Sequence, residues 1–121
     1  MTVTNISKTI DFYGSVLGTK AIEFVPPNGG QARQSLHFGS QKINLHDATS
    51  PYVPHAHAPK AGSLDLCFIS HQPLYDWQEH LANCGVKIEY GPVHKTGAIG
   101  NLLSIYIRDP DANLIEISNY I

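Results

Sequence analysis

One face of the predicted strands carries the side chains that could do chemistry. In four strands the apolar residues share one parity of the alternation, and the other parity holds imidazole, phenol, guanidinium and carboxylate groups. These positions are Ser35, His37, Asn44, His46, Asp65, Ser104, Tyr106, Arg108 and Glu116. None is lysine, although hydrated strand faces usually carry it. Such groups bind metals and polarise small ligands, so we predict a functional cleft, with a merely hydrated sheet surface as the alternative.

Three of these residues make a candidate metal site. An imidazole from His46 with carboxylates from Asp65 and Glu116 is a mixed nitrogen and oxygen donor set. It suits a divalent ion such as Zn, Ni, Mn or Fe, with positions left for water and substrate. The three residues lie on different strands and have no local spacing signature. The alternatives are a satisfied, half-buried His46, an Asp65–Arg108 pair and a surface ion pair at Glu116.

The C-terminal strand pair positions Glu116. Residues 104–108 and 114–118 alternate strictly between apolar and polar side chains. The intervening Asp-Pro-Asp-Ala-Asn supplies turn-forming residues, which predicts a hairpin with Glu116 in mid-strand on its polar face.

The rest of the chain reads as two copies of one order of elements: strand, helix and three strands. The predicted elements of the first copy are a strand end at 1–4, a helix from 5 or 7 to 17, and strands at 21–25, 34–38 and 42–46. Those of the second are a strand at 63–70, a helix from 73 to 84, a strand at 86–90 and the hairpin. Gly85 aligns with Gly18, and Glu116 with His46.

This repeat predicts an α+β fold within a single domain spanning 1–121. Module one covers 1–47, a linker 48–62 and module two 63–121. We expect the two βαβββ modules to form a curved mixed sheet with the helices on its outer face. The first strand is truncated, because the partner of Asp65 in the first copy would fall before Met1.

Composition excludes several partners. The chain has 121 residues, 42% hydrophobic and 15% charged, with a formal net charge of -2. That balance gives no electrostatic case for nucleic acid or an anionic membrane. No signal peptide or spanning segment is recognisable, so we expect a cytoplasmic protein. Cys67 and Cys84 lack a CxxC spacing and are expected to be reduced thiols.

Three phrases resemble the vicinal oxygen chelate superfamily, which includes glyoxalase I, extradiol dioxygenases and bleomycin-resistance proteins. They are SKTIDFYGSVLG, HAPKAGSLDLCFI and the ending SIYIRDPDANLIEISNY. Among its members the sequence is most similar to the small glyoxalase domain-containing protein 5 type. The resemblance covers nearly the whole chain. One departure is Ala112, where the turn phrase usually has Gly; a left-handed turn there would strain Ala by about 1 kcal/mol.

The resemblance implies specific roles for the polar face. The metal ligands come from the first and last strands of each module, which carry over to His46, Asp65 and Glu116, with the first ligand position lying before Met1. A divalent ion would bind two neighbouring substrate oxygens and stabilise a developing oxyanion, with Glu116 as ligand and possible base. The residues implied to orient substrate are His37, Asn44, Ser104, Tyr106 and Arg108. Small members often pair as homodimers.

The leading prediction is therefore a glyoxalase-like metal-dependent lyase or isomerase acting on a small vicinal-oxygen substrate. One alternative is a metal-free protein that sequesters a ligand, as bleomycin-resistance proteins do, which the missing first-strand ligand favours. Another is an Fe(II) extradiol-type dioxygenase, which requires two His and one carboxylate, so that Asp65 argues against it. A further possibility is that Met1 is not the native start.

Overall fold

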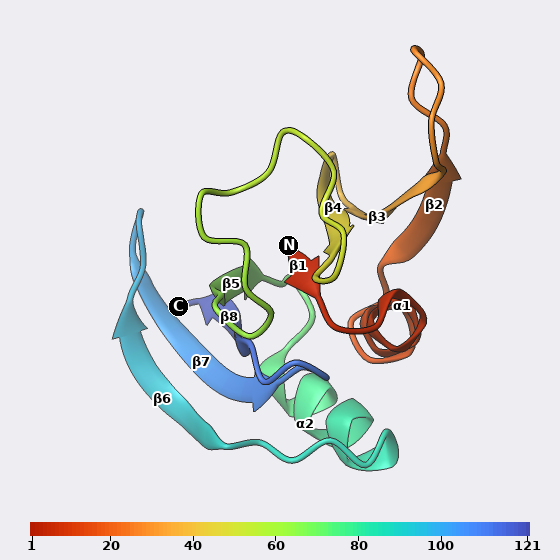
Figure 1. The fold of residues 1–121 in the computed structure, drawn as a ribbon. Helices are drawn as coiled ribbons and strands as arrows, with labels where there is room; N and C mark the ends of the chain where they lie inside the picture. Colours follow the sequence, from red (N-terminus) through yellow and green to blue (C-terminus); the bar gives the residue numbers. More distant parts are fainter. The chain divides into compact units, whose positions relative to one another are not determined.

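Each copy of the repeat folds into a four-stranded mixed sheet with one helix (Figure 1). The computed structural model describes residues 1–121, which divide into two compact units, 1–64 and 65–121. Unit 1 contains β1 (Thr2–Val3), α1 (Ile6–Ser15), β2 (Lys20–Phe24), β3 (Arg33–Phe38) and β4 (Gln41–Asp47). Unit 2 contains β5 (Asp65–Ile69), α2 (Leu74–Asn83), β6 (Tyr90–Thr96), β7 (Asn101–Arg108) and β8 (Leu114–Tyr120).

Strand order is the same in both units. It is β1-β4-β3-β2 in unit 1 and β5-β8-β7-β6 in unit 2, with the first two strands of each order parallel and the other neighbours antiparallel. The α+β fold of two βαβββ modules is thereby confirmed. In β1–β4 pairing Thr2 stands opposite His46, just as Cys67 stands opposite Glu116 in β5–β8.

Unit 1 is built around α1 and the β3–β4 hairpin. The side chain of Asn5 caps α1 by accepting a hydrogen bond from the backbone N–H of Lys8 at 2.9 Å. Tyr13 on the helix and Leu36 and Leu45 on the strands are fully or almost fully buried. The predicted helical stripe and strand alternation therefore form the core of this unit.

In unit 2 the core lies between α2 and the β7–β8 hairpin. Ile105, Ile107, Ile115 and Ile117 are at most 1% exposed, and Leu81 of α2 is fully buried. Burying each of these side chains contributes about 1.5–3 kcal/mol, so the apolar parity fixes which face of the hairpin meets the helix. Glu116 and Tyr106 lie on the opposite face.

The strand predicted at 86–90 is misplaced. Val86 instead closes the end of α2, where its backbone N–H donates to the carbonyl of Leu81 at 2.9 Å. The strand begins at Tyr90 and continues to Thr96, with a register shift between Tyr90 and Val93. Pro92 interrupts the sequence pattern, but an edge strand tolerates proline because one side of it has no ladder partner.

In the turn at 109–113, Ala112 adopts the left-handed conformation that the sequence comparison with the turn phrase had raised as a possibility. Ala112 has a φ of 63°, and it is the one non-glycine residue with positive φ. The backbone N–H groups of Asp111 and Asn113 each donate to Asp109 Oδ1 at 2.9 Å. The side-chain Nδ2 of Asn113 donates to Asp109 Oδ2 at 2.8 Å. The buried Asp109 therefore holds the turn despite the strained alanine.

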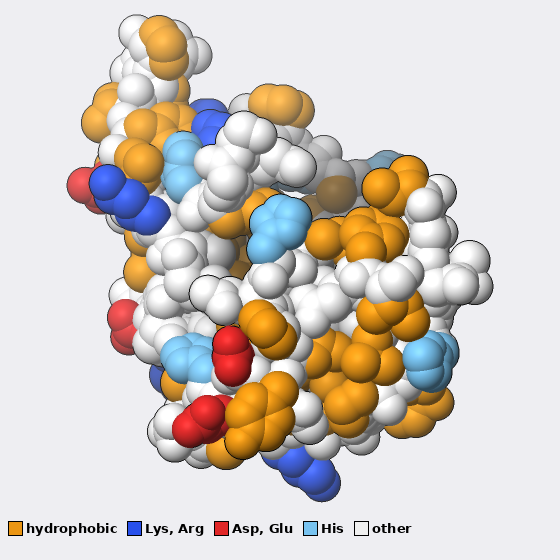
Figure 2. Space-filling model, turned by 180° about the vertical axis from the view of Figure 1, so that it is seen from behind, with side chains coloured by type: hydrophobic (Ala, Val, Ile, Leu, Met, Phe, Trp, Pro, Cys, Tyr) orange, Lys and Arg blue, Asp and Glu red, His pale blue; other side chains and the backbone are white.

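On the face drawn in Figure 2, Lys and Arg side chains lie apart from one another and no field of one sign forms. No helix has the length and apolar character needed to cross a membrane. Neither cysteine forms a disulfide.

Candidate active site

Glu116 lies at the centre of a cluster of hydrogen-bonding side chains in unit 2. Ser118 Oγ donates to Glu116 Oε1 at 3.0 Å, and Ser104 Oγ lies 2.7 Å from Ser118 Oγ. Cys67 Sγ is 3.6 Å from Ser118 Oγ, and Tyr106 hydrogen bonds to Glu116. We call Cys67, Ser104, Tyr106, Glu116 and Ser118 the Glu116 cluster. The pairing of the strands brings these residues together. Glu116 on β8 stands opposite Tyr106 on β7 and Cys67 on β5, and Ser118 stands opposite Ser104 on β7.

The cluster keeps the carboxyl of Glu116 ionised. Burial alone would raise the pKa of Glu116, but hydrogen bonds from Ser104, Ser118, Tyr106 and Cys67 outweigh it and lower that pKa. Tyr106 responds in the opposite sense: burial first, then its hydrogen bond to Glu116 and that residue's negative charge, raise its pKa to about 12. At neutral pH the site therefore holds a carboxylate beside a neutral phenol.

Burial also controls the thiol in the cluster. It raises the pKa of Cys67. The hydrogen bond with Ser118 is the next-largest cause and lowers that pKa, while the nearby carboxylates of Glu116 and Asp65 raise it. Cys67 therefore stays a protonated thiol at neutral pH. It acts as a weak hydrogen-bond donor and not as a nucleophile.

A hollow of about 460 Å³ opens over the cluster. Cys67, Tyr106 and Glu116 line one part of it, and Ile69 and Leu102 make another part apolar. The hollow also reaches the turn between β6 and β7, where Gly97 N–H donates to the Gly100 carbonyl at 2.8 Å. A small ligand with an oxygenated end and an apolar end matches this lining.

In unit 1, His46 belongs to a stack of three side chains. Its ring lies 3.9 Å from that of Tyr52 at an interplanar angle of 21°, and the guanidinium of Arg33 lies 3.7 Å from the centroid of the Tyr52 ring. His46 Nδ1 and Tyr52 Oη are both buried without a hydrogen-bond partner. Burial, followed by nearby positive charges that include Arg33, lowers the pKa of His46. The imidazole is therefore neutral at pH 7.

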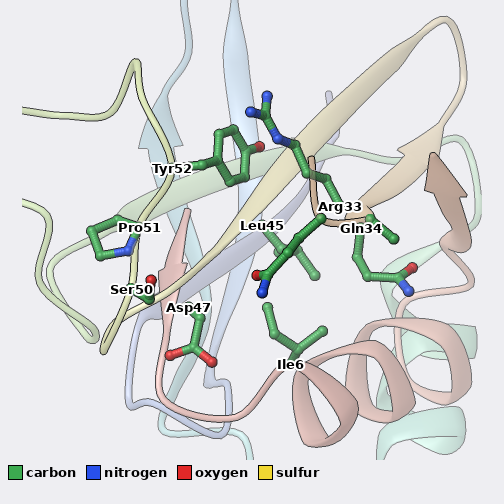
Figure 3. A pocket seen from close by; sticks show the side chains of 10 residues that line it. Ile6, Arg33, Gln34, Leu45, Asp47, Ser50, Pro51 and Tyr52 are labelled. Carbon is green, nitrogen blue, oxygen red and sulfur yellow. The ribbon is translucent and has the colours of Figure 1, made fainter. Parts of the chain in front are cut away.

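A second hollow, of about 470 Å³, lies beside this stack (Figure 3). Arg33 extends along Tyr52, Ile6 and Leu45 supply apolar side chains, and Asp47 stands to one side. Tyr52 comes from the segment predicted as a linker, which therefore contributes to the packing of unit 1.

The other predicted site residues divide into two groups. Ser104 and Tyr106 belong to the Glu116 cluster, as described. Arg108 points elsewhere: its Nε donates to Glu89 Oε2 at 3.0 Å and its Nη1 to the carbonyl of Ala112 at 3.1 Å. The alternative of an Asp65–Arg108 pair is therefore not observed.

On unit 1, His37 and Asn44 share the face of His46. Ser35 Oγ lies 2.9 Å from His37 Nε2, and Asn44 stands opposite Ser35 in the β3–β4 ladder. His37 is half-buried and Asn44 is exposed. Neither belongs to the Arg33–Tyr52–His46 stack.

Comparison with known proteins places the chain in a family. Residues 1–117 match the model of the "Glyoxalase/Bleomycin resistance protein/Dioxygenase superfamily". The chain belongs to this superfamily. The superfamily assignment agrees with the repeat, with the turn phrase around Asp109, and with the strand that carries Glu116.

Relatives within the superfamily are similar over the whole chain. The glyoxalase domain-containing protein RDO1 of Mycosarcoma maydis is 49% identical over 120 residues, and the virulence protein STM3117 of Salmonella typhimurium is 50% identical over 121. The chain spans 65% of the length of the first and 81% of the second.

Solved structures of superfamily relatives agree closely with this fold. The crystal structure of STM3117 has a TM-score of 0.91 at 48% identity, covering 100% of this chain and 92% of that one. The integron cassette protein VCH_CASS1 from the mobile metagenome of V. cholerae has a TM-score of 0.92 at 47% identity, covering 100% and 91%.

The donor set that superfamily membership implies fits a divalent ion chemically. His46 is neutral, as a metal ligand must be, and its Nδ1 is a buried atom without a partner. Glu116 is ionised and braced by hydroxyl donors, the arrangement that orients ligating carboxylates. Asp65 is exposed on the same face of β5 as Cys67. His46 belongs to unit 1 and the two carboxylates to unit 2, and neither unit alone gathers three His, Cys, Asp or Glu side chains into one group.

Sequence reasoning missed several residues of these arrangements. Ser118 and Cys67 share the parity of Glu116 and Asp65, so alternation alone could have added them to the site. Arg33 stands one residue before the predicted strand at 34–38. Tyr52 carried no signal, because stacking on His46 depends on how an irregular segment folds back.

Proposed function

We propose that this chain is a glyoxalase-like, metal-dependent lyase or isomerase acting on a small substrate with vicinal oxygens, of the glyoxalase domain-containing protein 5 type. The observation that supports it is the ionised carboxylate of Glu116, held by hydroxyl groups in a hollow of about 460 Å³ that is otherwise partly apolar. A carboxylate fixed in this way can accept a proton from a bound molecule.

The residues of the Glu116 cluster have different roles in the proposed reaction. Glu116 takes the proton at one carboxylate oxygen while Ser118 holds the other, so that the carboxylate keeps its orientation. Tyr106 remains a neutral phenol because its pKa is about 12; once Glu116 has taken the proton, the Tyr106 hydroxyl can turn from Glu116 and donate to the substrate oxygen that gains negative charge. His46, Asp65 and Glu116 would hold a divalent ion, Zn, Ni, Mn or Fe, which supplies Lewis-acid stabilisation of that charge.

Metal content and proton exchange test this proposal together. The protein is purified without chelators or a metal-binding tag, and its metals are counted by elemental mass spectrometry. Exchange of the α-proton is followed by NMR in D₂O with the hemithioacetal of methylglyoxal and glutathione and with glyceraldehyde. We expect about one ion per chain and measurable exchange. We expect both to fall at least about 100-fold in Glu116→Gln, because ligand and base are removed at once.

Glu79→Gln is the matched control, since Glu79 is exposed on α2. It should keep both the metal and the exchange activity. A wild-type protein that stays metal-free after incubation with each of the four ions would overturn the proposed enzyme.

A second candidate is a metal-free protein that sequesters a small organic ligand. The observation that favours it is the aromatic lining of the same hollow by Tyr106 and Tyr120 beside apolar Ile69 and Leu102. Saturable binding of aromatic compounds by the metal-stripped protein, without any proton exchange, would favour this reading.

The proposal includes an assembly and a location. We propose a homodimer in the cytoplasm, because small members of the superfamily often pair. Sedimentation equilibrium at micromolar concentration tests the dimer, and a single species of 13.3 kDa would contradict it.

A further inference from the structure

Lys95 is a cation in the unit 2 hollow that has no carboxylate partner. Its ammonium lies 5.5 Å from the ring centroid of Tyr90 and 5.7 Å from that of Tyr106. The salt bridge in this unit joins Arg108 to Glu89 and does not involve Lys95. The ammonium therefore rests on two aromatic faces with its hydrogen-bond donors directed to no acceptor of the protein.

The position of this ammonium is set by the sheet. Lys95 stands opposite Leu102 in the β6–β7 ladder, and Tyr90 stands opposite Tyr106 beyond the register shift. The two tyrosine rings are 5.8 Å apart and tilted by 36°, so the side chain of Lys95 folds over a ready-made aromatic surface. Lys95, Tyr106 and Glu116 all line the hollow.

Tyr106 connects the cation to the carboxylate. Its ring lies near the Lys95 ammonium and its hydroxyl bonds to Glu116. The two charges therefore flank one phenol ring within one hollow. A ligand in this hollow can place oxygenated carbons at Glu116 and an anionic group at Lys95, because both side chains line it.

We infer that the substrate of this site is a small carboxylic acid with vicinal oxygens, and that Lys95 binds its carboxylate. The inference rests on the proposed function for the placing of the reacting oxygens at Glu116. Lys95 contributes one positive charge, and Glu116 and Asp65 lie on the same face. A singly charged carboxylate balances Lys95, whereas a phosphate with about two negative charges would leave one facing those carboxylates.

Ligand titrations followed by two-dimensional NMR of the metal-stripped protein, with the chelator removed, test the inference. The probes are glycerate, dihydroxyacetone phosphate and dihydroxyacetone, which carry a carboxylate, a phosphate and no charge. We expect glycerate to bind tightest and to shift the amide signals of Thr96, Gly97 and Leu102. In Lys95→Met its affinity should fall about tenfold or more, because a charge-assisted hydrogen bond is lost.

Lys87→Met is the matched control, since Lys87 is an exposed lysine between α2 and β6. It should leave glycerate binding unchanged, and well-dispersed spectra of both variants establish that they fold. Equal binding by the wild type and Lys95→Met, stronger binding of dihydroxyacetone phosphate, or no binding of glycerate at millimolar concentration would each overturn the inference.

The same titration in Glu116→Gln separates this inference from the proposed function. Glycerate binding that depends on Lys95 and persists in Glu116→Gln supports the carboxylate site even where metal content and proton exchange contradict the enzyme. Metal binding and proton exchange without any role for Lys95 would support the enzyme and overturn the carboxylate site.

Discussion

Glu116 shows how neighbouring strands set the charge of a single residue. Its carboxyl is half-buried, which by itself opposes ionisation, yet donors from β5, β7 and β8 lower its pKa. Alternation along the sequence identified Glu116, Tyr106 and Ser104, because parity alone places them on one face. It could not say that Arg108 turns to Glu89, since that depends on the conformation of the segment before β6.

Glu116 should make the stability of the metal-free protein depend on pH. Its pKa is lowered below the usual 4.5 on folding, so its contribution is present above pH 4.5 and is lost as pH falls through the lowered value. We expect Glu116→Gln to be less stable than the wild type by about 1 kcal/mol at pH 7. The difference should shrink as the pH falls below 4.5.

Urea unfolding at pH 7 and pH 3 measures this difference. Glu79→Gln serves as the control, because that side chain is exposed and has no such donors, and it should change little at either pH. A difference for Glu116→Gln that grows on acidification would mean that burial outweighs the hydrogen bonds.

At the scale of elements, the sequence predicted both helices and most strands because their apolar periods are unambiguous. The strand predicted at 86–90 is wrong for a local reason. Val86 has a strand-like neighbourhood, but its N–H closes α2, and the true strand begins at Tyr90 and continues through Pro92 with a register shift before Val93. The β7–β8 hairpin was predicted together with its turn. The possible strain at Ala112 was also anticipated, and its positive φ confirms the conformation.

Ala112→Gly should stabilise the protein by about 1 kcal/mol. Glycine adopts the φ of 63° without the steric conflict that alanine meets between its Cβ and the backbone. Thermal unfolding measures the change. Ala82→Gly, on an exposed helical residue of α2, should destabilise by about 1 kcal/mol and so change the melting temperature in the opposite direction.

Gly91→Ala should destabilise the β6–β7 pairing by about 3 kcal/mol. Gly91 has a φ of 100°, and a Cβ there would collide with the backbone oxygen of Ser104. Since Ser104 belongs to the Glu116 cluster, Gly91 lets the edge strand approach the site closely. Denaturant unfolding tests this, with Gly100→Ala as control, because a Cβ at Gly100 meets the ring of Tyr120 at 3.7 Å. Equal losses in the two variants would contradict it.

At the scale of the whole molecule, the chain consists of two units that each have their own core. The sequence repeat predicted two modules within one domain, and in both copies one parity of the strands is buried under one helix. The alternation of apolar and polar residues within one module does not specify how the two modules are arranged. That His46 and Glu116 bind one ion together is therefore a hypothesis, based on their equivalent positions in the two copies of the repeat.

Separate cores should make core substitutions in the two units additive. Val16 of unit 1 is 4% exposed and Ile117 of unit 2 is 1% exposed. Val16→Ala should cost about 2 kcal/mol and Ile117→Val about 1 kcal/mol, from the methyl groups removed. Because the two side chains belong to different compact units, the double variant should lose the sum to within about 0.5 kcal/mol. Guanidinium unfolding with an unchanged denaturant slope measures all three, and a coupling above about 1 kcal/mol would show that the two cores pack as one.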